Sequence, residues 1–536
     1  MDKKTEKELV VQSPNEVVKN LVAELSSDEV AHDRSAILDK IRTALASLEQ
    51  VEEPNWVSES AEPFDRVTGE TMSYQRMIDI LEKVGMISRG KDVWEGGGYM
   101  WLPYGMRLKQ AIFDGFAGRL DTLGYGPFQS PRILPREIID NVISKIVDLT
   151  RGTYWLAEKR DGEFRDSGRS ANSTNDPVIN YHLRGEIKSG RARFPFKGYS
   201  HHQIIRSHSV PTRPFLNSDE NTDLFEAYSI SETDEACELE FEVIIKTLQE
   251  YFRSLGIAFL TIDQSMWGNK PVAKKVTSLQ SFVSPVKGSV RIATIYKHSD
   301  TFARAFHVAT ERDNGKKEYV HQVGFGFWEG LIPPLLDQLR DKYGLCLPPS
   351  IAPTQISIIP NNQRFEAVAR DLAAMIGGHK VAIDQRYNKP IQHRLKDSMV
   401  AGVPIRVTFE DDGKIRFSRR DTLKQGSVET REFAETVPLL LKSISSNYEE
   451  RARAHLVSNV KQVVNISELG TMLSQSKLAT FDHCGEDECG KNMEGRFHGE
   501  FLGHVREIAV NEESCCIGCG AVAKRTGFFG KRAPTP

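Results

Sequence analysis

Five of the 7 cysteines in the sequence lie close together near its C-terminal end. Cys484 and Cys489 are separated by four residues, and Cys516 and Cys519 form a Cys-x-x-Cys pair. Zinc prefers four thiolate or imidazole ligands in a tetrahedron, and two close pairs brought together by the intervening segment satisfy that geometry. The spacing therefore predicts a structural zinc site formed by these four cysteines. Four thiolates leave no open position for water, which argues against a catalytic zinc.

Other side chains in this segment are alternative ligands. Cys515 directly precedes Cys516 and can replace it, and His483, His498 and His504 supply imidazoles. A metal-free turn or a vestigial site is the alternative to zinc.

A second group of residues could neutralise phosphates. The whole sequence has 70 lysines and arginines against 73 aspartates and glutamates, a formal charge of -3, so a polyanion must meet a local basic face. Basic residues are frequent in one domain-sized stretch: Arg386, Lys389, Arg394, Lys396, Arg406, Arg416, Arg419, Arg420 and Lys424. A solvated charged face is the alternative, and charge spacing alone does not decide between the two.

The hydrophobic pattern indicates the elements that carry these basic residues. Residues 355–359 read as a buried strand, and Phe365, Val368, Leu372 and Met375 recur at helical spacing. Further strands are predicted at 380–383, 402–407 and 414–417, the last two across an Asp-Gly hairpin signal. Strand, helix, strand and hairpin predict a mixed α/β sheet.

This order of elements, with IAPTQ at 351–355, AGVPIRV at 401–407 and SRRDT at 418–422, resembles the anticodon-binding domain of proline-type class II aminoacyl-tRNA synthetases. The resemblance is to the archaeal and eukaryotic type, and it extends from about residue 97 onward. It implies an α+β fold with an antiparallel class II core, an α/β anticodon-binding domain and a small C-terminal zinc domain. It also implies tRNA contacts from Arg386, Lys389, Arg419 and Arg420, and a homodimer.

Length and composition are compatible with several globular domains. At 536 residues the chain is too long for one core. We expect a helical extension at 1–70, a catalytic-like domain at 71–349, an anticodon-binding-like domain at 350–455 and a zinc-binding domain at 456–536. Without a signal peptide or an apolar run of roughly 20 residues, the sequence predicts a cytoplasmic protein with no membrane contact.

Formation of an aminoacyl adenylate requires cations on the phosphates of ATP, together with Mg²⁺. Residues 212–216 read TRPFL, as in the family, and Arg206 upstream is the candidate arginine of motif 2. Arg213 is a second candidate for ATP contact. The resemblance also makes Glu226 a candidate catalytic residue.

Motif 3 departs from the family pattern. Residues 326–332 read GFWEGLI where the family has GVSTRLI, which puts Gly330 at the arginine and Glu329 beside it. A carboxylate there would repel a phosphate. Substitute cations are available at Arg291, Lys297, His298 and Arg340, although such residues are more often surface charges.

The sequence therefore predicts a prolyl-tRNA synthetase-like protein that binds tRNA and zinc but has little or no ordinary proline activation. One alternative is an active ligase that uses ATP and Mg²⁺ to activate proline or another amino acid. Another is a regulatory, protein-binding relative.

Overall fold

The computed structural model describes residues 73–89, 98–141, 153–205, 213–216, 222–265, 272–311, 315–410, 412–497, 499–510 and 513–533. The helical extension expected at 1–70 lies outside the described residues. Within them, no helix combines the length and apolar character needed to cross a membrane.

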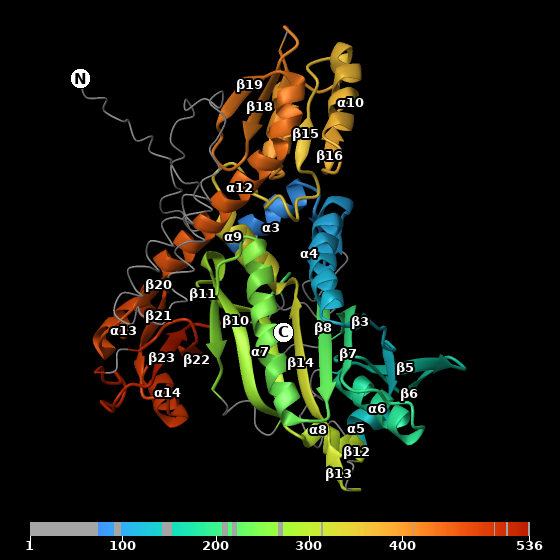
Figure 1. Ribbon diagram of the computed structural model, residues 1–536, viewed down its shortest axis with the longest axis vertical. Helices are drawn as coiled ribbons and strands as arrows, with labels where there is room; N and C mark the ends of the chain where they lie inside the picture. Colours follow the sequence, from blue (N-terminus) through green and yellow to red (C-terminus); the bar gives the residue numbers. More distant parts are fainter. Residues whose placement is uncertain are drawn as a thin grey trace, which may run out of the picture.

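A large sheet runs through the body of the molecule (Figure 1). Its strands, in spatial order, are β20 (Val460–Gln462), β21 (Leu478–His483), β23 (Arg525–Gly530), β22 (Glu500–Val505), β9 (Leu260–Asp263), β10 (Ala273–Val283), β11 (Gly288–His298), β14 (His321–Trp328), β8 (Thr222–Ser231), β7 (Phe196–Ile204) and β3 (Gly126–Pro127). Neighbouring strands from β21 to β7 are antiparallel. This confirms the predicted antiparallel core.

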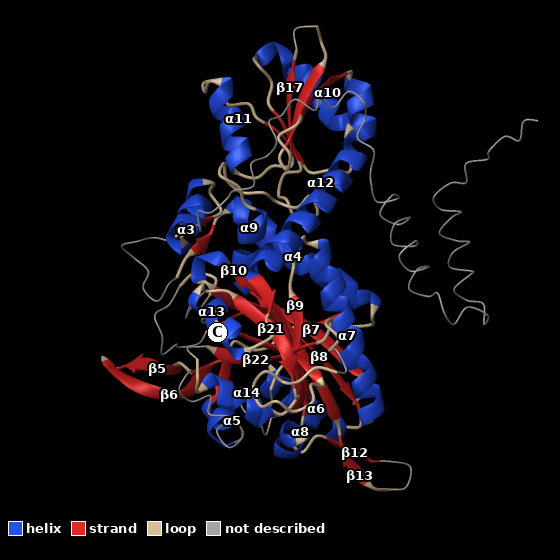
Figure 2. Cartoon of the chain, turned by 90° about the vertical axis from the view of Figure 1, so that its left-hand side faces the viewer, coloured by secondary structure: helices blue, strands red, loops and turns tan. Residues whose placement is uncertain are grey.

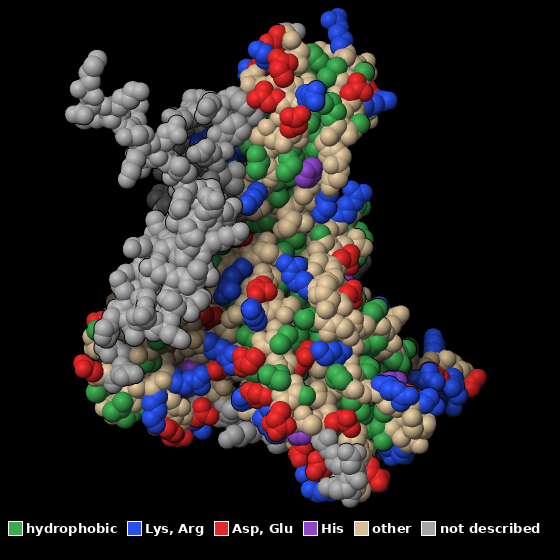
Figure 3. All heavy atoms as spheres, viewed as in Figure 1, with side chains coloured by type: hydrophobic (Ala, Val, Ile, Leu, Met, Phe, Trp, Pro, Cys, Tyr) green, Lys and Arg blue, Asp and Glu red, His purple; other side chains and the backbone are tan. Residues whose placement is uncertain are grey.

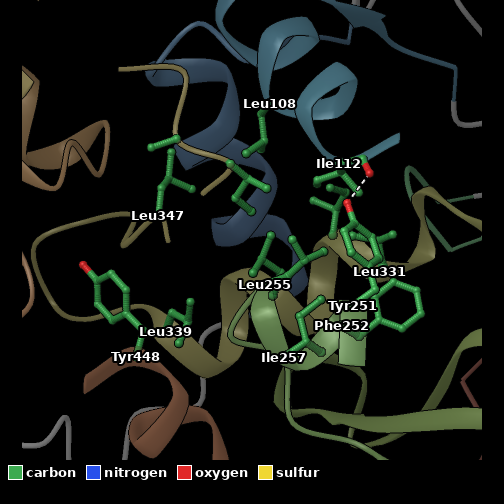
Figure 4. Close-up of a cluster of buried hydrophobic side chains, with 14 of the residues drawn as sticks. Leu108, Ile112, Tyr251, Phe252, Leu255, Ile257, Leu331, Leu339, Leu347 and Tyr448 are labelled. Carbon is green, nitrogen blue, oxygen red and sulfur yellow. Dashed lines mark hydrogen bonds between the residues drawn. The ribbon is translucent and has the colours of Figure 1, made fainter. Parts of the chain in front are cut away.

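Two long helices, α4 (Pro103–Thr122) and α7 (Asp234–Ser254), cover one face of this sheet. Leu108, Ile112, Phe116 and Leu120 recur every four residues along α4 and are completely buried. Figure 4 shows Leu108 and Ile112 above Leu255 and Leu331, with the hydroxyl of Tyr251 donating to the carbonyl of Ile112. The stripe is therefore part of the main core.

Shorter elements complete this part of the molecule, and the β5–β6 hairpin projects from it (Figure 2). The helices are α3 (Tyr74–Lys83), α5 (Arg136–Asn141), α6 (Asp176–Lys188), α8 (Thr301–Phe306) and α9 (Ile332–Leu339), with the 3-10 turns η3 (Ser284–Val286) and η4 (Glu329–Leu331). The strands are β1 (Ile87–Ser88), β2 (Met100–Trp101), β4 (Ile133–Pro135), β5 (Trp155–Arg160), β6 (Glu163–Ala171), β12 (Ala309–Glu311) and β13 (Lys317–Tyr319). Helices α6 and α8 pack together on the sheet face opposite α7.

A second unit holds the predicted mixed sheet, at the top of Figure 1. Its strand order is β16 (Val381–Ile383), β15 (Ile356–Ile358), β17 (Ile405–Phe409), β18 (Ile415–Arg419) and β19 (Gln425–Val428). Strand β15 is parallel to both neighbours, whereas β17, β18 and β19 are antiparallel, so the mixed sheet is confirmed. The helices are η5 (Gln363–Phe365), α10 (Glu366–Met375), α11 (Ile391–Val400) and α12 (Thr430–Asn459).

The stripe predicted for α10 is partly wrong. Val368 and Met375 are 38% and 48% exposed, whereas Ala369 and Leu372 are completely buried. Alanine counts little in a hydrophobic pattern, but its small side chain allows the helix to approach the sheet closely.

Helix α12 leads from the α/β unit to β20, the edge strand of the central sheet (Figure 1). Strand β20 follows α12, and helix α13 (Ile466–Ser474) lies between β20 and β21. Helix α14 (Asp487–Glu494) follows. On the face in Figure 3, acidic and basic side chains are interspersed, in keeping with the small net charge.

Candidate functional site

The sheet face opposite α7 has a floor of glycines at β14. Gly326 is paired with Glu226 of β8. A β-carbon at Gly326 would lie 2.4 Å from the carbonyl oxygen of Phe225, and one at Gly324 would lie 2.7 Å from Nε2 of His298. Close packing therefore requires glycine at both positions. Gly324 is buried against His298 and Tyr228, and Gly326 is half-buried.

The predicted catalytic residue Glu226 lies on this face. Its carboxylate accepts hydrogen bonds from Oγ1 of Thr174 (3.2 Å) and from the backbone N–H of Asn175 (3.1 Å). Nε2 of His202 lies 3.6 Å from Oε2 of Glu226. The carboxylate is therefore oriented by the loop that precedes α6.

His298 and Lys297, two of the predicted substitute cations, lie on β11 with their side chains on opposite faces of the sheet. His298 is buried near the glycine floor, with Nε2 3.6 Å from Oδ1 of Asp176. Burial lowers the pKa of His298 although Asp176 acts in the other direction, which favours a neutral imidazole. Lys297 instead faces α7 and pairs with Asp234 (2.9 Å) and Glu238 (2.6 Å). Lys297 is thus not available to a phosphate on the glycine side.

The other predicted cations differ in their surroundings. Arg206, the candidate arginine of motif 2, lies outside the described residues. Arg213 is exposed, and its guanidinium carbon lies 5.8 Å from the ring centroid of Tyr74. Arg340 pairs with Asp337 at 3.1 Å and would have to leave this partner to reach a phosphate.

Gly330 is enclosed by a neighbouring side chain. It lies in η4, directly after β14, where the resembled family has an arginine. A β-carbon at Gly330 would lie 2.2 Å from Nε1 of Trp328. Trp328 is 9% exposed, and its Nε1 has no hydrogen-bond partner among the described residues. The position of the missing cation is therefore filled by an indole, not left open.

Glu329 faces away from Gly330 into a buried polar network under α4. Lys109 forms an ion pair with Asp223 and lies 3.5 Å from Oε1 of Glu329. Tyr99 donates its hydroxyl proton to Glu329, and Nε1 of Trp101 donates to Oε1 of Glu329 at 2.6 Å. The network joins β2, α4, β8 and η4 by their side chains.

The two carboxyl groups of this network have opposite pKa shifts. Burial, reinforced by the negative charge of Asp223, raises the pKa of Glu329 to about 8. Burial acts in the same direction on Asp223, but a hydrogen bond from His201 and the charge of Lys109 outweigh it, and the pKa of Asp223 is lowered to about 2. At neutral pH the folded protein therefore holds one ionised and one protonated carboxyl group.

Three of the four predicted zinc ligands, Cys484, Cys489 and Cys516, lie together with His483. One ligand atom from each of His483, Cys484, Cys489 and Cys516 lies within 4.8 Å of the others. Sγ of Cys489 is 3.7 Å from Sγ of Cys516, and the thiol of Cys519, which is exposed, is close enough to interact with those of the other three cysteines. Three convergent thiols and one imidazole, with Cys519 nearby, are a donor set that fits zinc.

Burial favours Cys516 over Cys515, whereas His483 lies within the cluster as an alternative to the exposed Cys519. Cys516 is buried within the cluster, whereas Cys515 is exposed. Nδ1 of His483 lies 3.0 Å from Nε2 of His504, so His504 is held behind the cluster. His498 lies outside the described residues.

Arg419 and Arg420 are completely buried, which corrects their assignment to RNA contact. The guanidinium of Arg419 donates to both carboxylate oxygens of Asp421, at 3.0 and 2.6 Å. That of Arg420 donates to Asp341, at 2.8 Å for Nη2. A guanidinium without exposed surface cannot reach a phosphate. Arg420 instead ties the α/β unit to the segment after α9.

Arg386 and Lys389 lie at the surface, along a cleft of about 670 Å³. The guanidinium of Arg386 donates to Asp384 (2.6 Å) and to Asp397 (2.8 Å). Lys389 is exposed. Arg386 would have to exchange these acidic partners for phosphates, and Lys389 is the more accessible cation of the two.

A larger cleft, of about 930 Å³, lies between α11 and the sheet of the α/β unit. Arg406 on β17 lines it and is 7% exposed; its Nε donates to Oγ of Ser418 at 3.1 Å. No carboxylate of the described residues contacts Arg406. Burial, with repulsion from Arg420, lowers the pKa of Arg406 to about 10, so the guanidinium stays charged at neutral pH.

Comparisons with known proteins agree with this architecture. A family model described as an anticodon binding domain matches residues 355–439. The proline–tRNA ligase of Thermococcus kodakarensis is 27% identical over 468 residues, covering 84% of this chain and 96% of that protein. The proline–tRNA ligase of Pyrococcus horikoshii is 25% identical over 496 residues, covering 90% of this chain and 99% of that protein. This chain is a homologue of the archaeal proline–tRNA ligases.

A solved structure supports the fold. The prolyl-tRNA synthetase of Cryptosporidium parvum, crystallised with halofuginone and AMPPNP, superposes with a TM-score of 0.78 at 18% identity. It covers 85% of this chain and 94% of that one. This homologue therefore has the class II synthetase fold.

Two features of the site were not predicted. The network of Lys109, Asp223 and Glu329 joins residues far apart in the sequence, and no local motif marks it. Arg406 was one of several basic residues. Its place inside a strand of alternating apolar residues is the signal that could have set it apart.

Proposed function

We propose that this homologue binds tRNA through the α/β unit. The observation that carries the proposal is Arg406, a buried guanidinium at the wall of a wide cleft, in the segment that matches the anticodon-binding model. An arginine can donate two hydrogen bonds to a guanine edge, and single-stranded bases offer such edges to proteins. His393 and Lys396 line the same cleft and could stack on a base and pair with a phosphate.

Filter binding of tRNA to Arg406→Gln tests the proposal. We expect affinity to fall by about 10- to 100-fold, because a bidentate base contact is worth roughly 1–3 kcal/mol. Arg416→Gln is the matched control, since Arg416 lines the same cleft but pairs with Glu410 at 2.8 Å. Unchanged affinity in Arg406→Gln would contradict the assigned surface. No tRNA binding by the native protein would favour the regulatory alternative.

We also propose that ordinary proline activation is weak or absent. The support is the packing of Trp328 on Gly330, which leaves no room for a cation from η4. Loss of one charged phosphate contact costs about 10²- to 10³-fold in rate. Proline-dependent exchange of pyrophosphate into ATP should therefore be low, and Gly330→Arg alone should not restore it.

The outcome of this assay separates the alternatives. Robust exchange with proline would refute the inactive assignment. Exchange with another amino acid would instead support the alternative of a ligase with a different substrate.

We propose a structural zinc ion at the four cysteines, with no role in a chemical step. Zinc bound there would fix the turns that carry Cys484, Cys489, Cys516 and Cys519. Metal analysis of the purified protein should find about one zinc per chain. A homodimer is proposed from the family resemblance, and light scattering tests it directly.

A further inference from the structure

We propose that His483 is a reserve ligand of the zinc site, which takes the fourth coordination position when the thiol of Cys519 is lost. This inference rests on the proposed structural zinc ion and adds a ligand that a set of four cysteines does not include. Cys484, Cys489 and Cys516 hold the metal in both forms, whereas the fourth donor is either sulfur or nitrogen.

The thiol of Cys519 is the accessible one of the four predicted ligands. Cys484 and Cys516 are buried and Cys489 is half-buried, whereas Cys519 is exposed. It lies in a tight turn, in which the backbone N–H of Gly520 donates to the carbonyl of Cys516 at 2.9 Å. Cys519 is therefore open to solvent and to reagents that modify thiols, and it is the ligand that the site can most readily lose.

The imidazole of His483 is held in place by the central sheet. His483 is the last residue of β21, is completely buried and pairs with Arg525 of β23. Its ring packs against that of Phe501, with the ring centroids 4.8 Å apart. One of its ring nitrogens and the three other sulfur atoms of the site all lie within 4.8 Å of one another. A second nitrogen donor therefore lies beside the three thiols on a paired strand.

The hydrogen bonds of His483 leave one ring nitrogen for a metal. Nδ1 lies 3.0 Å from Nε2 of His504 and accepts a hydrogen bond from the backbone N–H of Gly485, also at 3.0 Å. Nε2 is buried and has no hydrogen-bond partner among the described residues. A buried nitrogen without a partner is unfavourable. A metal ion bound to Nε2 would remove this defect.

His504 is the positioning partner of the reserve ligand. A histidine that binds a metal usually donates its other ring N–H to a neighbouring acceptor, which fixes the orientation of the ring. With Nε2 of His483 on the metal, Nδ1 carries the proton and donates to Nε2 of His504. His504 is 3% exposed and lies on β22, so two strands of one sheet carry the histidine pair.

The same hydrogen bonds explain why His483 is the reserve rather than the first choice. When Nδ1 carries the proton, it no longer accepts from the N–H of Gly485, and binding of Cys519 avoids this loss. Three cysteines and one histidine are, like four cysteines, a closed tetrahedral set. The exchange of ligands therefore keeps the site structural and opens no position for water.

Titration of the full chain with cobalt(II), followed by its absorption spectrum, tests the exchange. The charge-transfer band grows with the number of thiolates, and the visible bands shift when nitrogen replaces sulfur. The native chain should show four thiolates. Cys519→Ala should still bind about one cobalt per chain, with the spectrum of three thiolates and one nitrogen. Adding His483→Phe or His504→Phe to Cys519→Ala should each weaken binding by about 10- to 100-fold.

His483→Phe and Cys515→Ser, each with Cys519 in place, are the controls. Both should give the native spectrum, which shows that the cluster folds without the imidazole. The reserve role is overturned if Cys519→Ala alone loses the metal, or if His483→Phe does not weaken binding by Cys519→Ala. It is also overturned if His483→Phe alone releases the metal. A native chain that binds neither cobalt nor zinc would instead refute the proposed zinc site itself, and the reserve ligand with it.

Discussion

Replacement of Glu329 by glutamine should remove much of the pH dependence of stability between pH 5 and 8. In the folded chain the pKa of Glu329 is raised to about 8 by burial and by Asp223, compared with an ordinary value of 4.5. Between these two values the folded state holds a proton that the unfolded state has released. The free energy of unfolding therefore falls as the pH rises through this window, and the contribution is complete below pH 4.5.

The magnitude follows from the size of the window. One pKa unit corresponds to about 1.4 kcal/mol, so the loss from the lower to the upper limit reaches about 5 kcal/mol. In Glu329→Gln the amide is uncharged, like the protonated carboxyl group. Because Tyr99 donates to Oε2 and Trp101 to Oε1 of Glu329, the amide oxygen keeps one of these bonds and the NH₂ group takes the place of the other oxygen. The variant should be about as stable as the native protein at pH 5 and clearly more stable at pH 8.

Urea unfolding followed by fluorescence, at half-unit steps from pH 5 to 8.5, measures this difference. Glu435→Gln provides a control, because Glu435 is an exposed glutamate paired with Arg431 on α12. If the curves for the native protein and Glu329→Gln run parallel across the window, the assignment of a protonated Glu329 is wrong.

Three further predictions concern stability and metal binding. Lys109→Met leaves Asp223 buried without its cation and should lower the free energy of unfolding by about 3–5 kcal/mol, measured in urea at pH 7. Arg420→Ala leaves Asp341 buried without its cation and should lower the free energy of unfolding by a similar amount. The tRNA affinity, measured under conditions in which the variant is folded, should change little. A large loss of tRNA affinity without a loss of stability would instead support an RNA-binding role for Arg420. Cys516→Ser should release zinc and lower the melting temperature, whereas Cys515→Ser should do neither, as judged by metal analysis and thermal scans.

Elements with a regular local pattern were predictable from the sequence. Leu108, Ile112, Phe116 and Leu120 recur every four residues, and α4 buries all of them. Three of the four predicted cysteine ligands converge, together with His483, as expected from two close pairs in the sequence.

Features that depend on distant partners were not predictable. Arg419 and Arg420 look like surface charges, and only the fold brings Asp341 to Arg420. The surroundings of Gly330 in motif 3 also depend on side-chain packing. The sequence predicts that Gly330 stands where the resembled family has an arginine, but not that the indole of Trp328 packs against Gly330.

The pairing of β22 with β9 has a consequence for how the chain can be divided. Backbone hydrogen bonds between these strands make the cysteine-bearing region part of the same sheet as the glycine floor. Cutting the chain at residue 456 would strip β9 of a neighbour and expose its N–H and C=O groups to other chains. The truncated protein should aggregate when it is expressed alone. It should be recovered in soluble form only when the C-terminal piece is co-expressed with it.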